Sequence, residues 1–161
     1  MLRIEPTEAA IIACLAKPEV LAGVAGAGAF RAVVARDEVW LIGGARRRSQ
    51  LLDLARAQVE PAGGLVVDQT DGWSMWTVRG QGAEVLWRRL SVIPVPSSRP
   101  AFVQGAVAAV PGRTIFAEGA IHVLVPSPVG HHLRERMLEA GRDLGPTLDP
   151  ASEFKPGANP R

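Results

Sequence analysis

Three histidines are the side chains of this sequence best suited to proton transfer or metal binding. His131 and His132 are adjacent in a segment whose spacing predicts a helix, so their side chains point about 100° apart and cannot hold one metal ion together. His122 stands in an apolar run, and no third or fourth ligand follows at a spacing typical of zinc sites. The histidines therefore predict no metal site.

The cysteine, aspartate and serine side chains are also better explained by structural roles than by catalysis. Cys14 is the single cysteine, and because Ile12 and Leu15 flank it, we expect a small buried residue rather than a catalytic thiol. Asp68 and Asp71 could form a carboxylate pair, but a run rich in Asp, Thr and Gly is more typical of a turn. No nucleophile-elbow motif accompanies a serine. We predict no catalytic residue from these patterns.

The segment Gly26-Ala27-Gly28 begins like a dinucleotide-binding loop. Arg31 stands where the third glycine belongs, and no strand is expected before it. We therefore interpret this segment as a flexible connector.

Three consecutive arginines, Arg46, Arg47 and Arg48, precede a predicted helix, where positive charge opposes the helix dipole. They form either a docking site for an anion or an acidic partner, or a solvated corner, which is the commoner meaning of a charge run.

Trp73, Trp76 and Trp87 could stack on a flat heterocycle. Their strand and helix spacing is more typical of packing in a core or at an interface.

Composition sets the class of protein. Hydrophobic residues make up 47% and charged residues 21% of 161 residues, which is ordinary for a soluble protein of one domain. A net charge of +2 argues against a dedicated nucleic-acid binder. No stretch approaches the roughly 20 apolar residues of a membrane span, and Pro6 and Glu8 interrupt any signal peptide. We expect a cytoplasmic protein that contacts neither nucleic acid nor membrane.

The segment 66–90 is the clearest structural unit. Val66 and Val67 predict a short strand, and the alternation in 75–79 predicts a second one with one buried face. Glycines 80 and 82 predict a tight turn. Residues 83, 86, 87 and 90 then form one apolar helix stripe.

The rest of the chain predicts an α+β fold with mixed or antiparallel sheets and packed helices. We expect a helix at 5–17, strands at 30–35 and 39–42, a helix at 49–59, a meander of strands at 102–110, 113–118 and 120–125 with turns at 111–112 and 118–119, and a helix from Ser127. We divide the chain into an N-terminal helix and Gly/Ala-rich connector (1–30), an α+β domain (31–145) and an irregular Pro-rich tail (146–161).

This order of elements resembles the folate-binding domain of glycine-cleavage T-protein, the aminomethyltransferases, over roughly residues 38–145. The residues that carry the resemblance are Asp68, Thr70, Asp71, Trp73 and Gly80, the hairpin sequence RTIFAEGAIHVLVP at 113–126, and the helix at 131–141. The family's catalytic aspartate segment is not recognised here, and full aminomethyltransferases are about twice this length. Cys14 does not stand in the Lys-Gly-Cys-Tyr context of the Fe–S-assembly branch.

Within this family, the sequence is most similar to the short gamma subunit of heterotetrameric sarcosine oxidase. The resemblance implies a reduced aminomethyltransferase-like fold that binds no cofactor itself. It places FAD, FMN and NAD in the alpha and beta subunits, zinc in the delta subunit, and tetrahydrofolate in the alpha subunit. It implies a non-catalytic, structural subunit of an enzyme that oxidises sarcosine or a related N-methyl amine.

Under this hypothesis the residues expected to face partners are Trp73, Trp87, Arg46, Arg47 and Arg48. The alternative is a free-standing tetrahydrofolate-binding protein or small aminomethyltransferase-like protein. In that alternative Glu118, near the family's matching glutamate, and Trp73 and Trp76 contact the pterin. A third hypothesis is a structural module that docks an acidic partner through the arginine run.

Overall fold

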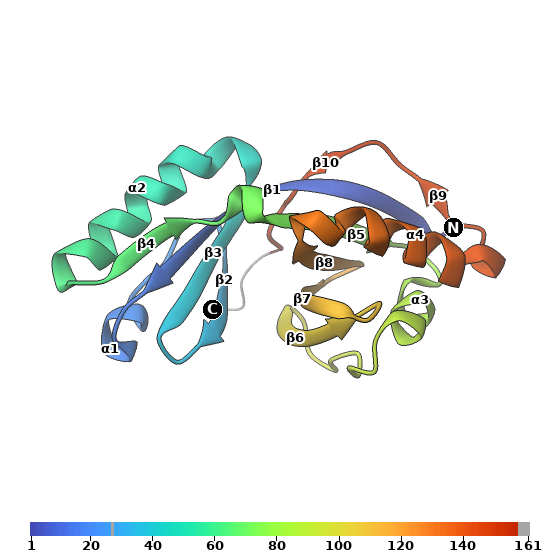
Figure 1. Cartoon of the computed structure of the whole chain (residues 1–161), viewed down its shortest axis with the longest axis horizontal. Coiled ribbons are helices and arrows are strands. Elements are labelled where there is room, and N and C mark those ends of the chain that lie inside the picture. Colours follow the sequence, from blue (N-terminus) through green and yellow to red (C-terminus); the bar gives the residue numbers. More distant parts are fainter. Residues whose placement is uncertain (27, 158–161) are drawn as a thin grey trace. The chain divides into compact units, whose positions relative to one another are not determined.

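The computed structural model describes residues 1–26 and 28–157 (Figure 1). The chain divides into two compact units, each described here by itself. Unit 1 contains Met1–Thr7 and Gly72–Ser152, and unit 2 contains Glu8–Asp71 and Glu153–Arg161. The segment Gly26-Ala27-Gly28 lies partly outside the described residues, as do the last four residues of the tail.

The N-terminal segment is a strand, β1 (Arg3–Leu15), and the predicted helix at 5–17 is wrong. All residues from Ala10 to Cys14 are buried, so the apolar positions that suggested one helical stripe are instead both faces of a strand. A continuous apolar run of this kind cannot be assigned to helix or strand by periodicity alone. The first five residues of β1 belong to unit 1 and the others to unit 2.

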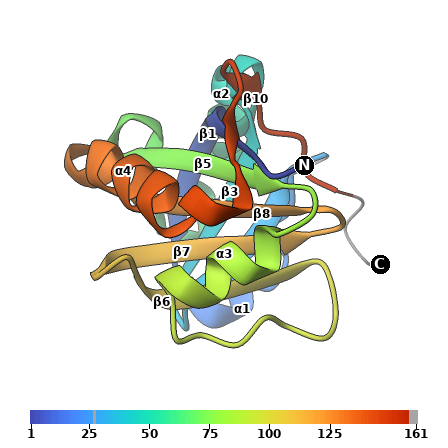
Figure 2. The ribbon, with the colours of Figure 1, turned by 90° about the vertical axis from the view of Figure 1, so that its right-hand side faces the viewer.

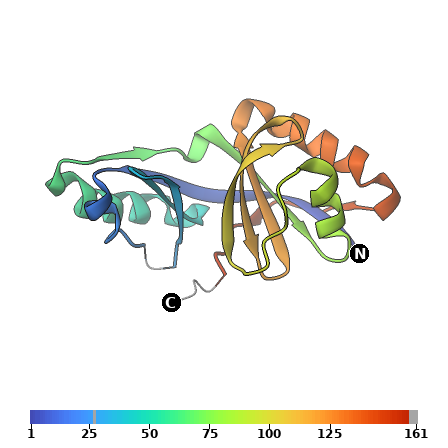
Figure 3. The ribbon, with the colours of Figure 1, turned by 90° about the horizontal axis from the view of Figure 1, so that it is seen from below.

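Unit 2 is an antiparallel sheet covered on one face by a helix. The strand order is β2 (Phe30–Ala35), β3 (Glu38–Gly44), β1 and β4 (Leu65–Asp68). The long helix α2 (Arg48–Val59) buries Leu51, Ala55 and Val59 against Ile12 and other residues of the sheet, and Figure 3 shows it lying along the strands of this unit. The short elements are α1 (Pro18–Leu21), η1 (Ala45–Arg47) and η2 (Glu60–Ala62).

Unit 1 is built on a second sheet, in which β1 pairs with β5 on one side and with β9 on the other. The strand order is β9 (Thr147–Leu148), β1, β5 (Trp73–Arg79), β8 (Ala120–Pro126), β7 (Val110–Ala117) and β6 (Ala101–Val107). Among these six strands β9 is parallel to β1, and the other pairs are antiparallel. The strands of this sheet therefore pair mostly in antiparallel orientation, and the sequence predicts mixed or antiparallel sheets.

Two helices supply the other half of the core of unit 1. They are α3 (Ala83–Leu90) and α4 (Gly130–Ala140), seen beside the strands in Figure 2. Their buried residues Leu86, Trp87, Leu133 and Met137 share one cluster with alternate residues of the strands, such as Val123. The remaining short elements are η3 (Thr70–Gly72), η4 (Ser127–Val129), η5 (Arg142–Leu144) and β10 (Ser152–Glu153).

The predicted strand, glycine turn and helix of the 66–90 segment are confirmed, and so is the α+β class. The first turn of the meander lies at Ala108 and Ala109, not at Pro111 and Gly112. Both alanines adopt positive φ values of 51° and 64°, as a two-residue hairpin turn requires. Pro111 instead pairs with Ala106 inside the ladder.

The tail from residue 146 is less irregular than predicted, because it contributes the two short strands β9 and β10. Among the described residues, no helix has both the length and the apolar character that crossing a bilayer requires.

Candidate functional site

Arg48, the last residue of the arginine run, is held inside unit 2 by two carboxylates. Its Nε donates to Asp68 Oδ2 at 2.6 Å, and its two Nη atoms donate to the oxygens of Asp71 at 3.2 and 2.8 Å. Burial alone raises the pKa of Asp68, but the hydrogen bonds from Arg48 and Thr70 outweigh it and bring that pKa below its ordinary value. The Asp-x-Thr-Asp sequence therefore clamps the start of α2 to the end of β4.

Thr70 completes this clamp. Its backbone N–H donates to Asp68 Oδ1 at 3.0 Å, and its Oγ1 accepts from the backbone N–H of Ile11 at 3.0 Å. The turn is thus tied to β1 as well as to α2. The two aspartates act as a turn and an arginine anchor in this structure.

The other two arginines of the run differ from Arg48. Arg46 has a side chain that is 91% exposed and lies 3.9 Å from Glu153, while Arg47 Nε donates to Gln50 Oε1 at 3.0 Å. The structure therefore does not gather three guanidinium groups into one anion site. A partner contact by this run stays a prediction, and Arg46 is its most accessible member.

Trp73 is half-buried at the start of β5, and the guanidinium carbon of Arg113 lies 4.5 Å from its ring centroid. Arg113 Nε also donates to Gln104 Oε1 at 3.1 Å. These three residues line a pocket of about 530 Å³ whose other walls come from the β6–β7 hairpin. One face of this indole is therefore engaged by a cation of the same unit.

The two other candidate tryptophans of unit 1 lie in its core. Trp87 is 2% exposed, packs edge-on against Phe116 at a centroid distance of 5.0 Å, and donates its Nε1–H to Ile93 O at 2.8 Å. Trp76 is 9% exposed and belongs to the same cluster. This corrects the expectation that Trp87 faces a partner, because a side chain buried in its own core has no area to offer.

Glu118 and Trp73 lie at opposite ends of the same strand pair. Trp73 pairs with Pro126, whereas the β7–β8 turn that carries Glu118 adjoins Ala120, which pairs with Arg79. Six residues of strand separate the two ends, which is roughly 20 Å. The structure therefore does not bring together the residues expected to contact a pterin.

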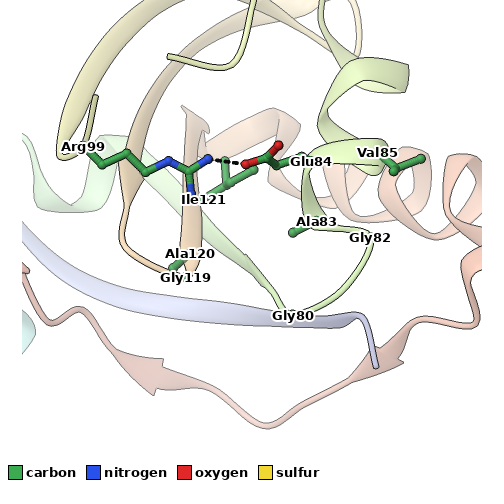
Figure 4. Close-up of a pocket in the computed structure, with 9 residues that line it drawn as sticks. All are labelled: Gly80, Gly82, Ala83, Glu84, Val85, Arg99, Gly119, Ala120 and Ile121. Carbon is green, nitrogen blue, oxygen red and sulfur yellow. Dashed lines mark hydrogen bonds and ion pairs between the residues drawn. The ribbon is translucent and has the colours of Figure 1, made fainter. Parts of the chain in front are cut away.

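Glu118 instead lines a pocket of unit 1 that the sequence does not reveal. Arg99, whose side chain is 18% exposed, forms an ion pair with Glu84 on the first turn of α3. These two residues line both a pocket of about 400 Å³, which Figure 4 shows, and a second pocket of about 430 Å³. The other walls of the first pocket are the small residues Gly80, Gly82, Ala83, Gly119 and Ala120 together with Val85 and Ile121, and the second pocket contains Glu118 and Arg88.

His122 is buried in a polar network that links three strands of unit 1. Its Nδ1 lies 2.8 Å from Thr77 Oγ1, which lies 2.6 Å from Thr7 Oγ1. Burial, and secondarily the charge of Arg79, lower the pKa of His122 to about 4, against a smaller opposing effect of Glu5. The imidazole is therefore neutral near pH 7 and is held by Thr77 between the strands.

The other residues that could bind a metal are dispersed. His131 pairs with Glu135 one turn along α4 at 2.9 Å, and His132 Nε2 lies 3.1 Å from Ala108 O. Cys14 is fully buried, and that burial raises the pKa of its thiol to about 11. No cluster of three or more ligating side chains occurs in the described part of the chain.

The sequence interpretation missed the Glu84–Arg99 pair and the Thr7–Thr77–His122 network. Arg99 lies in a loop 15 residues beyond Glu84, and Thr7 lies 70 residues before Thr77. The one signal in the sequence was the predicted helix start at Ala83. It places Glu84 in the first turn of α3 but does not identify Arg99 as its partner.

Comparison with known proteins detects no matching family model and no matching curated protein. Solved structures do match. One chain of the heterotetrameric sarcosine oxidase from Corynebacterium sp. U-96 superposes with a TM-score of 0.75 and 17% identity, over 88% of this chain and 84% of that one. The glycine cleavage system aminomethyltransferase T from Bartonella henselae gives 0.66 and 12%, over 93% of this chain and 47% of that one.

The ligand-free regulatory subunit of aspartate kinase from Thermus thermophilus is a more distant match, with a TM-score of 0.53 and 12% identity over 87% of this chain and 97% of that one. At such identities the likeness concerns the fold. The chain has the α+β fold of the sarcosine oxidase and aminomethyltransferase folate-binding-like domains, as the sequence resemblance implies.

Proposed function

We propose that this chain is a non-catalytic, gamma-type subunit of a heterotetrameric oxidase of sarcosine or a related N-methyl amine. The observation that carries the proposal is the superposition on a sarcosine oxidase chain over 88% of one chain and 84% of the other. Because the two coverages are nearly equal, the chains are of similar length, and the likeness extends across a whole subunit rather than one domain of a larger one. The same chain spans about half of the aminomethyltransferase it resembles.

The internal engagement of the polar side chains supports a structural role. Arg48 is bound by Asp68 and Asp71, and His122 is bound by Thr77. Groups held in this way are positioned to stabilise their own unit, and the lowered pKa of His122 keeps its imidazole neutral near pH 7. The proposal therefore assigns the amine oxidation, with its FAD, FMN and NAD, to the alpha and beta subunits. Zinc is assigned to the delta subunit, and tetrahydrofolate to the alpha subunit.

A tetrahydrofolate-binding protein is the second candidate. One observation favours it: Glu118, the residue matched to the family's folate-binding glutamate, lines a pocket of about 430 Å³ that also contains Arg88 and Arg99. The separation of Glu118 from Trp73 argues against one pterin that contacts both residues, as the sequence leads us to expect in this alternative. Calorimetric titration of the purified chain with tetrahydrofolate separates the two candidates, since the subunit proposal expects no heat of binding at high micromolar ligand.

Co-purification tests the subunit proposal. An affinity-tagged chain is co-expressed with the polypeptides encoded beside its gene, and the captured material is analysed for flavin absorbance and for sarcosine-dependent electron transfer. The proposal expects the tag to retain a flavin-containing oxidase. Capture of the tagged chain alone, in cells that make the neighbouring polypeptides, contradicts it.

A further inference from the structure

The tail of the chain is bound within unit 2 through two adjacent residues. One carboxylate oxygen of Glu153, Oε1, accepts from the backbone N–H of Arg46 at 3.1 Å, and the other, Oε2, lies 3.9 Å from Nε of the Arg46 side chain. Phe154 donates its backbone N–H to Glu8 O at 2.8 Å and is 2% exposed. The tail is therefore held by an acidic residue followed by a buried aromatic one.

The backbone beside Arg46 has room for this carboxylate because residue 44 is a glycine. A Cβ at Gly44 would lie 2.6 Å from Glu153 Oε1 and 3.0 Å from Glu153 Cδ. A backbone N–H that donates to an ionised carboxylate forms a charge-assisted hydrogen bond, which is stronger than one between neutral groups. We call the arrangement of Gly44, the Arg46 N–H and Glu8 O the Glu153 cradle.

Few backbone bonds hold the tail in place. Strands β9 and β10 have two residues each. Three prolines of the tail, at positions 146, 150 and 156, cannot donate a hydrogen bond to a neighbouring strand. The Arg46–Glu153 pair has side chains that are 91% and 34% exposed, and such accessible pairs stabilise a fold only weakly. Because segments of this kind open at a lower free energy than paired strands, we expect the tail to leave the cradle without unfolding of unit 2.

Release of the tail changes the charge at the start of α2. Glu153 offsets the charge of Arg46 while the tail is bound, and the next residue, Arg47, donates to the neutral Gln50. When Glu153 leaves, the Arg46 N–H and both guanidinium groups lose this carboxylate. The vacated cradle therefore favours an acidic side chain, and the space left by Phe154 favours an aromatic one.

We propose that the tail is a latch on a peptide-docking site. Residues 153–154 occupy the Glu153 cradle in the isolated chain, and an acidic residue followed by an aromatic one, on a partner subunit, replaces them on assembly. The resident pair defines the chemistry of the partner segment, because both compete for the same hydrogen bonds and the same buried space. The inference rests on the proposed function for the source of that segment. It goes further by naming the docking surface, the partner motif and the segment of this chain that moves.

A fluorescently labelled peptide with the sequence of residues 151–157 tests the cradle on the full chain. The double variant Glu153→Gln, Phe154→Ala vacates the cradle and is expected to bind this peptide at least about tenfold more tightly than the unmodified chain, whose own tail competes. Adding Arg46→Glu to the double variant is expected to weaken peptide binding about tenfold. Equal binding of the peptide by the double variant and the unmodified chain, or binding by neither, overturns the inference.

Two matched controls separate the cradle from general effects of substitution. Lys155→Ala changes an exposed residue of the tail and is expected to leave the peptide as weakly bound as it is by the unmodified chain. Arg36→Glu, added to the double variant, reverses an exposed charge in the turn before β3 and is expected to leave peptide binding unchanged. Circular dichroism confirms that each variant is folded.

Hydrogen exchange tests the latch in the unmodified chain. In the isolated chain the N–H of Phe154 is expected to exchange at least about tenfold faster than that of Ile12, which β3 and β4 flank. Equal protection of these two amides overturns the inference. In the assembly, the amides of residues 152–157 are expected to lose protection, because the partner segment replaces them. A tail that stays protected in a complete assembly overturns the inference and leaves the subunit proposal intact. Failure to assemble overturns the subunit proposal, and peptide binding then decides the cradle by itself.

Discussion

His122 Nδ1 lies 2.8 Å from Thr77 Oγ1, and Thr77 in turn lies 2.6 Å from Thr7, so one buried imidazole connects β8 to β5 and β5 to the first half of β1. Nearby, Arg79 Nε donates to Glu5 Oε1 at 2.9 Å across the same β1–β5 pair. Val78 and Ile121 point from these strands into the core that α3 and α4 cover. Thr77 and His122 alternate with them, so the network lies on the opposite face of the strands.

Because the pKa of His122 is about 4 in the folded protein, the imidazole remains neutral at pH values where it is protonated in the unfolded chain. Between about pH 6.5 and 4 the unfolded state therefore binds more protons, and the free energy of unfolding falls as the pH falls. The full loss is expected to be about 3 kcal/mol. Urea unfolding at a series of pH values measures it.

A matched pair of variants separates His122 from other titrating groups. His122→Gln is expected to flatten the pH dependence between 6.5 and 4, even if it lowers stability throughout. His131→Gln alters an exposed histidine outside the network and serves as the matched control for the substitution itself. A dependence that survives His122→Gln would falsify the assignment.

Asp68 is expected to stabilise unit 2 because it accepts from both Arg48 and the backbone of Thr70. Asp68→Ala leaves the guanidinium with one fewer acceptor and the Thr70 N–H with none from this side chain, and is expected to cost about 1–2 kcal/mol. Glu60→Ala removes the carboxylate of an exposed pair with Arg56 and is the control, with an expected change within about 0.5 kcal/mol. Equal effects of the two variants in urea unfolding contradict the clamp.

The adjacent glycines before β4 are expected to tolerate a methyl group differently. Gly64 has no room, because an added Cβ lies 2.4 Å from Val59 Cγ1 and 2.7 Å from Leu15 O. Gly63 has room but a φ of 79°. Gly63→Ala is expected to cost about 1 kcal/mol from backbone strain, and Gly64→Ala about 2–3 kcal/mol from overpacking. Thermal unfolding of the two variants ranks them, and the opposite order contradicts the packing of this turn.

Cys14 is expected to be unreactive in the folded protein, because its thiol is fully buried and its pKa is raised to about 11. Labelling with a thiol reagent at pH 8 should proceed only through unfolding of unit 2 and should accelerate with urea. Stoichiometric labelling within seconds in native buffer, at the rate of a free thiol, contradicts this burial.

Much of unit 1 could be predicted from local patterns. The alternation at 75–79 predicts a strand, which the structure extends to Trp73–Arg79, and the apolar stripe of the predicted helix includes Leu86, Trp87 and Leu90. The β7–β8 hairpin was predicted from Glu118-Gly119, where the structure has a turn with a φ of 69° at Gly119. In these segments the local preference agrees with the fold.

The failures have a common physical cause, which is that tertiary pairing outweighed a local signal. β1 lies between β3 and β4, and its residues from Ala10 to Cys14 are all buried, so side chains on both faces of the strand are apolar and the alternation typical of strands is lost. The candidate site depended on long-range contacts as well. No local pattern could predict that Arg48 would bind Asp68 in the turn after β4, or that Trp87 would pack in the core against Phe116.

We propose that this chain is a structural subunit of a flavin-containing amine oxidase. Native mass spectrometry of the assembly formed on co-expression with the neighbouring polypeptides tests this proposal most directly. We expect one species that contains this chain in a fixed ratio to flavin-bearing subunits. A spectrum in which this chain appears only as a free monomer, beside a complete and active oxidase that lacks it, would contradict the claim.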